Sequence, residues 1–136
     1  MKKVFIVMAV LLGILVVVSS CSPTSPQEEV KFRVEVSRFG FDKNPGEFRL
    51  DVEAGQEVEI TFVYGDGDFD ENNPHIIAIP DYGLETGVLD RENPEVTVSF
   101  TAGSAGEVVA FTCIRTACVG HAPNLQGGTI VIQPGS

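Results

Sequence analysis

The fold is decided by the stretch Phe48-Arg-Leu-Asp-Val-Glu-Ala-Gly55-Gln-Glu-Val-Glu-Ile-Thr-Phe62, in which apolar residues alternate with charged or polar ones on both sides of a glycine. A period of two is typical of a β-strand with one buried face and one face in water. Gly55, in the sequence Ala54-Gly55-Gln56, can supply the backbone freedom of a tight turn. We therefore predict two strands here, joined as a hairpin.

The same alternation recurs along the rest of the chain, in Val30–Val36, His75–Ile79, Val96–Phe100, Val109–Cys113 and Ile130–Ile132. About seven short strands separated by Gly, Pro and Asn turns, with no helical period, predict an all-β protein built as an antiparallel β-sandwich. A chain of 136 residues with 43% apolar and 21% charged residues has the size and composition of one globular domain.

The N-terminus is predicted to be an export signal rather than part of that domain. Lys2 and Lys3 precede an uncharged apolar run, Val4–Val18, which is shorter than the roughly 20 residues that a membrane span needs. The sequence Val18-Ser-Ser-Cys21 resembles the lipobox of bacterial lipoproteins. That resemblance implies cleavage before Cys21 and attachment of lipid to it; an uncleaved single-span helix is the alternative.

These features divide the chain into a signal peptide (1–20), a Pro/Ser-rich flexible tether (21–29) and a β-domain (30–134). Lipid on Cys21 would anchor the domain to the bacterial membrane on its extracytoplasmic side, periplasmic or at the cell surface. The sequence does not distinguish the inner from the outer membrane.

The charge of the chain restricts its partners. Its formal net charge is −10, and removal of the signal peptide would take two lysines and no acidic residue. So acidic a surface argues against nucleic acid and anionic lipid as partners and suits a cationic redox protein, although it also serves ordinary solubility. The acidic run Asp66–Asn73 lacks the spacing of a calcium loop, so we interpret it as a solvated hairpin tip or as a docking point beside His75.

The candidate site lies near the C-terminus, where Cys113, Cys118 and His121 share a short loop between two apolar runs. Cys113 has the strand parity of Val109 and Phe111, so its sulfur should point toward the core at the end of a strand. His75, the chain's other histidine, has the same parity as Ile77 and Ile79. These four side chains could hold copper or zinc, or the two cysteines could form a disulfide and leave the histidines without a role.

The motifs Asn73-Pro-His75-Ile-Ile-Ala-Ile-Pro80, Phe111-Thr-Cys113, Gly120-His121 and Gly128-Thr-Ile-Val-Ile132, in this order, resemble the CuA-type copper-binding domain of cytochrome c oxidase subunit II, a cupredoxin. The resemblance implies a Greek-key β-sandwich that holds copper through His75, Cys113, Cys118 and His121. It also implies one-electron transfer, by a carrier that is not itself an enzyme or by a non-catalytic part of an oxidase complex. A c-type cytochrome is then the natural cationic partner.

Two features of the loop depart from that family and point to an altered site. Ile114-Arg-Thr-Ala117 separates the cysteines by one residue more than the family does, and Asn124 stands where the family has methionine. The spacing Cys118-Val-Gly-His121 is instead similar to plastocyanin-like loops that bind a single copper, with Gln126 at the axial position. Copper could therefore be mononuclear or altered binuclear, and an axial oxygen from Gln126 or Asn124 would lower its reduction potential relative to methionine.

Three other functions remain open from the sequence. The chain could capture or deliver copper without redox turnover, or form a divergent component like oxidase subunit II. With a Cys113–Cys118 disulfide it could also be a metal-free interaction domain, since paired cysteines in an oxidising compartment are most often bridged.

Overall fold

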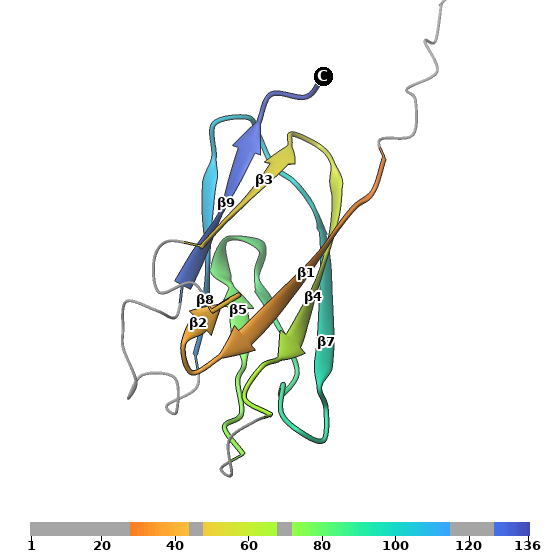
Figure 1. The fold of residues 1–136 in the computed structure, drawn as a ribbon. Helices are drawn as coiled ribbons and strands as arrows, with labels where there is room; N and C mark the ends of the chain where they lie inside the picture. Colours follow the sequence, from red (N-terminus) through yellow and green to blue (C-terminus); the bar gives the residue numbers. More distant parts are fainter. Residues whose placement is uncertain (1–27, 44–47, 68–71, 115–126) are drawn as a thin grey trace, which may run out of the picture.

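The computed structural model describes residues 28–43, 48–67, 72–114 and 127–136, which form two β-sheets packed face to face (Figure 1). The prediction of an all-β sandwich is confirmed. The one helical element of the described ranges is the 3₁₀ turn η1 (Pro80–Tyr82). No helix in this part of the chain has the length and apolar character needed to cross a membrane.

The strands alternate between the sheets along much of the chain. The first sheet has the order β2 (Gly40–Phe41), β1 (Val30–Ser37), β4 (Glu57–Tyr64) and β7 (Glu95–Thr101). The second sheet has the order β3 (Phe48–Glu53), β9 (Gly127–Gln133), β8 (Val108–Cys113), β5 (Ile77–Ile79) and β6 (Leu84–Glu85). Apart from the very short β2 and β6, these are the strands that the alternation predicted.

Two pairs of strands are parallel, whereas the sequence predicted antiparallel pairing throughout. β1 runs parallel to β4, and β3 runs parallel to β9. Each parallel pair joins strands that are not consecutive, because the chain changes sheets between them. The other pairs, such as β4 with β7 and β8 with β9, are antiparallel.

The hairpin predicted at Gly55 is wrong. β3 belongs to the second sheet and β4 to the first, so the turn carries the chain across the sandwich. Gly55 has a φ of +76°, which suits glycine, and its N–H donates to the carbonyl of Ala102, 3.0 Å away. A turn that connects two sheets and a turn within a hairpin can both use a glycine between two alternating runs, so the local sequence could not distinguish them.

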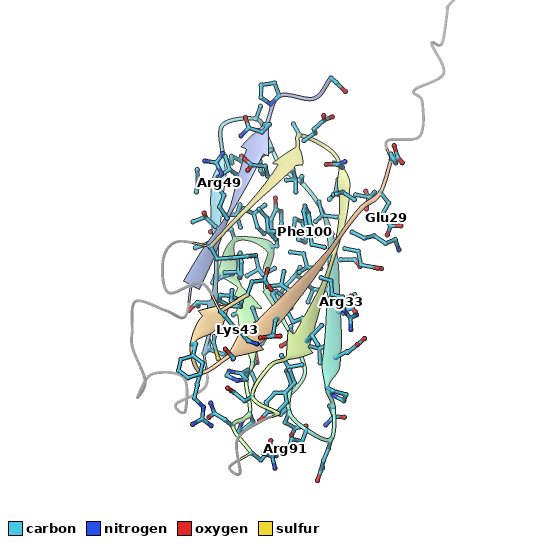
Figure 2. All side chains as sticks on the ribbon, in the orientation of Figure 1. Glu29, Arg33, Lys43, Arg49, Arg91 and Phe100 are labelled. Atoms are coloured by element: carbon cyan, nitrogen blue, oxygen red, sulfur yellow. The ribbon has the colours of Figure 1, made fainter. Side chains whose placement is uncertain are left out.

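The core between the sheets contains a cluster of phenylalanines. Phe41 and Phe62 come from the first sheet and Phe48 and Phe111 from the second, and the Phe111 ring lies 4.9 to 6.1 Å from the other three. Phe111 is fully buried, and its ring occupies the space where a side chain on the opposing residue, Gly128, would stand. By contrast, the side chains of Arg33 and Arg49 are exposed and point away from the sheets (Figure 2).

Candidate metal centre

His75 lies just before β5, and its backbone is fixed on both sides. Its N–H and its carbonyl each make a 2.9 Å hydrogen bond with Leu89, and the ring lies 6.0 Å from that of Tyr64. Only 1% of the residue is exposed. The inward direction predicted from strand parity is confirmed.

Cys113 is the last residue of β8 and pairs across the ladder with Ile77 of β5. It is 7% exposed, which confirms its predicted inward direction. Its Sγ lies 3.7 Å from Nδ1 of His75. The second sheet thus brings together two of the four predicted ligands, although they are far apart in the sequence.

The other predicted site residues, Cys118, His121, Asn124 and Gln126, lie outside the described residues, as does Cys21. Cys113, the one cysteine of the described ranges, is disulfide-bonded. Within these ranges no three or more His, Cys, Asp or Glu side chains gather as a metal-binding group.

Asp66 completes this end of the sandwich and was not among the predicted site residues. The parallel register of β1 and β4 pairs Val36 with Tyr64, and its continuation sets Asp66 beside Arg38 in the turn after β1. The carboxylate is fully buried. It accepts a 2.8 Å hydrogen bond from Nε2 of His75, and both of its oxygens accept from the backbone N–H of Arg38 at 2.9 and 3.0 Å.

The surroundings of Asp66 favour its ionised form. Burial by itself would raise its pKa, but hydrogen bonds from His75, from the Arg38 backbone and from Asn73 hold the pKa below its ordinary value. The prediction of a solvated hairpin tip is therefore wrong at both ends of that run, since Asp66 is 0% and Asn73 8% exposed. The sequence offered no signal for Asp66, because Arg38, whose N–H holds both of its oxygens, lies 28 residues earlier in the turn after β1.

The protonation of His75 follows from this contact. An ionised carboxylate can only accept hydrogen bonds, so Nε2 is the donor and carries a proton. The ring then presents its second nitrogen, Nδ1, to the sulfur of Cys113. An imidazole whose outer nitrogen is hydrogen-bonded to a carboxylate is the usual arrangement of a metal-ligating histidine.

The spacing of the two side chains also fits a shared metal ion. Ligand bonds of about 2.3 Å to sulfur and about 2.0 Å to nitrogen, at tetrahedral to trigonal angles, separate the two donors by roughly 3.5 to 3.7 Å. The observed 3.7 Å lies in this range. The donor set, a soft sulfur with an imidazole nitrogen, suits copper and zinc.

Comparison with known proteins identifies the fold. No protein-family model and no curated protein sequence matches the chain. Among solved structures, auracyanin A, a "blue" copper protein from Chloroflexus aurantiacus, matches with a TM-score of 0.52 and 23% identity over 78% of this chain and 100% of that one. Auracyanin from Roseiflexus castenholzii matches with a TM-score of 0.54 and 16% identity, over 76% and 97% of the two chains.

A chain of a heme-copper terminal oxidase dimer is also similar, with a TM-score of 0.55 and 17% identity over 82% of this chain and 76% of that one. At these identities the likeness establishes the architecture. The described residues have the cupredoxin-like β-sandwich fold.

Proposed function

We propose that the chain is an extracytoplasmic copper protein that carries single electrons. The observation that supports this most directly is the pair formed by His75 Nδ1 and Cys113 Sγ, 3.7 Å apart and buried at one end of a cupredoxin-like sandwich. The proposal adds Cys118 and His121 as the remaining ligands, with Gln126 or Asn124 as a weak axial oxygen donor. It also holds that the chain is a carrier and not an enzyme by itself.

The residues of the chain favour electron transfer in two ways. Thiolate and imidazole bind both Cu(I) and Cu(II), so copper held there would supply a one-electron couple. The two described ligands come from rigid elements, since Cys113 of β8 is paired with Ile77 of β5 and His75 is bridged to Leu89. A rigid site limits the rearrangement that accompanies a change in oxidation state.

The disulfide at Cys113 favours a second candidate, a metal-free domain stabilised by that bond. A thiolate ligand requires the bond to be reduced, which takes two electrons and two protons and yields two thiols. A dithiol reductant can supply these in the test tube. Thiol counting on the protein as isolated separates the candidates, because the copper protein keeps thiolates and the metal-free domain has none.

We predict that the reduced full-length protein binds copper tightly and develops an intense visible band. The band arises from charge transfer between a thiolate and Cu(II), and an EPR spectrum shows whether one copper nucleus or two share the unpaired electron. Copper content per chain is measured in parallel. A protein that still fails to bind copper after complete reduction would contradict the proposed function.

The visible band also tests the role. A protein that binds Cu(I) tightly but shows no thiolate–Cu(II) band, and no reversible one-electron couple, would be a copper carrier or delivery protein. Co-purification with a haem protein would instead indicate a component like oxidase subunit II. For an electron carrier, the acidic surface favours a cationic partner such as a c-type cytochrome.

The proposed location rests on the N-terminal sequence. We predict that Cys21→Ala moves the protein from the membrane fraction to the soluble fraction or leaves it unprocessed, because the residue that would carry the lipid is lost. Ser22→Ala, one residue further on, is the control and should leave the distribution unchanged. Equal distributions for the wild type and a Cys21→Ala protein that is processed like the wild type would exclude a lipid anchor at Cys21.

A further inference from the structure

Asp66 is unusual for an acidic residue, because its carboxylate is fully buried. A buried ionised group is costly unless several donors compensate it. Here the donors are His75 Nε2, the backbone N–H of Arg38, the Arg38 Nε at 3.4 Å and the Asn73 side-chain amide at 3.2 Å. So complete a set of donors suggests a specific role for the carboxylate.

The position of Asp66 is itself rigid. The backbone N–H of Arg38 spans both carboxylate oxygens, and this contact does not depend on which side chain stands at position 38. Tyr64, at the end of the strand before Asp66, accepts a 3.0 Å hydrogen bond from the backbone N–H of Asn73 through its hydroxyl oxygen. The loop that precedes His75 is thus tied to the strand that precedes Asp66.

The two ring nitrogens of His75 have different neighbours. Its Nε2 donates to Asp66, and its Nδ1 faces Cys113 Sγ. Without an acceptor at Nε2, a neutral imidazole can place its proton on either nitrogen. A proton on Nδ1 would block the nitrogen that faces the sulfur and compete with metal binding there.

We propose that Asp66 is a positioning residue, which orients the His75 ring and holds its proton on Nε2 so that Nδ1 can bind the metal together with Cys113. This inference rests on the function proposed above. The turn after β1 then belongs to the metal site, because it supplies the backbone N–H that holds Asp66.

The first test needs no metal. In the reduced, copper-free full-length protein with ¹⁵N-labelled histidine, a long-range proton–nitrogen spectrum reports which ring nitrogen is protonated, and the His75 signals are those lost in His75→Gln. We expect a proton on Nε2 in the wild type and in Asp66→Asn, whose amide oxygen can still accept. We expect partial or complete transfer of the proton to Nδ1 in Asp66→Ala.

The second test uses copper. Loss of an outer hydrogen-bond partner typically lowers metal affinity about 10- to 100-fold, and we expect a loss of this size for Cu(II) in Asp66→Ala. In Asp66→Asn the affinity should fall less, but the reduction potential should rise, because removal of a negative charge near the site disfavours Cu(II) relative to Cu(I). Should Asp66→Ala fail to fold, the potential of Asp66→Asn still tests the proposal.

A control variant separates positioning from the general effect of charge. Asp51→Asn makes the same charge change on the exposed face of β3. It should retain the wild-type proton position and Cu(II) affinity to within a few-fold.

The outcomes distinguish this inference from the function on which it rests. A wild-type ring with its proton on Nδ1, or Asp66 variants that lose stability while proton position, affinity and potential stay unchanged, would overturn the positioning role. A proton held on Nε2 by Asp66 in a reduced protein that does not bind copper would support the positioning of the ring and overturn the copper function.

Discussion

Phe111→Ala is expected to lower the free energy of unfolding by about 3–5 kcal/mol, the range for removal of a fully buried phenylalanine ring. Phe111 is 0% exposed and contacts Phe41 and Phe62 across the sandwich and Phe48 on its own sheet. Its loss would leave a cavity between the sheets, two residues before Cys113. Urea unfolding followed by circular dichroism measures the change.

The same strand provides the control. Val108 is 61% exposed, so Val108→Ala should change stability by no more than about 0.5 kcal/mol. Gly128→Ala should destabilise the wild type, because its Cβ would overlap the Phe111 ring, and should destabilise a Phe111→Leu protein less. A Phe111→Ala protein within about 1 kcal/mol of the wild type would show that the core rearranges to fill the space.

Cys113→Ser is expected to abolish the visible thiolate–Cu(II) band or reduce it severely, and to lower Cu(II) affinity by more than the roughly 100-fold that an outer hydrogen-bond partner can cost. The hydroxyl is a harder and weaker donor than a thiolate, and the Cys113 position lies 3.7 Å from His75 Nδ1. Absorption and copper titration of the reduced protein measure both effects.

Thr112→Ala is the matched control, since Thr112 precedes Cys113 on β8 and has the opposite strand parity. It should leave the band and the affinity unchanged. A Cys113→Ser protein that keeps the full band would assign the thiolate to another cysteine and remove Cys113 from the site.

Much of the fold followed from the local sequence, because strand alternation depends on which residues face the core. The period of two placed Val109, Phe111 and Cys113 on one inward face of β8, and all three are buried. The parity of His75 placed it inward as well. The family resemblance, in turn, put His75 and Cys113 in one site, and the structure brings them together.

Strand pairing did not follow from the local sequence. The turn at Gly55 looks the same whether it returns the chain to one sheet or carries it to the other, and here it changes sheets. The choice depends on where β1, β7 and β9 offer free edges, which is a property of the whole chain. For the same reason the parallel pairs of β1 with β4 and β3 with β9 were not predicted.

The amino-acid sequence by itself determined the strands, their buried faces and the inward direction of His75 and Cys113, because each of these depends on residues close together in the chain. Only the tertiary structure decided the sheet order and the role of Asp66. An acidic residue in a polar loop is ordinarily solvated. This one is buried because the parallel register of β1 and β4 brings the Arg38 N–H to it and because the folded loop brings His75 Nε2 within 2.8 Å.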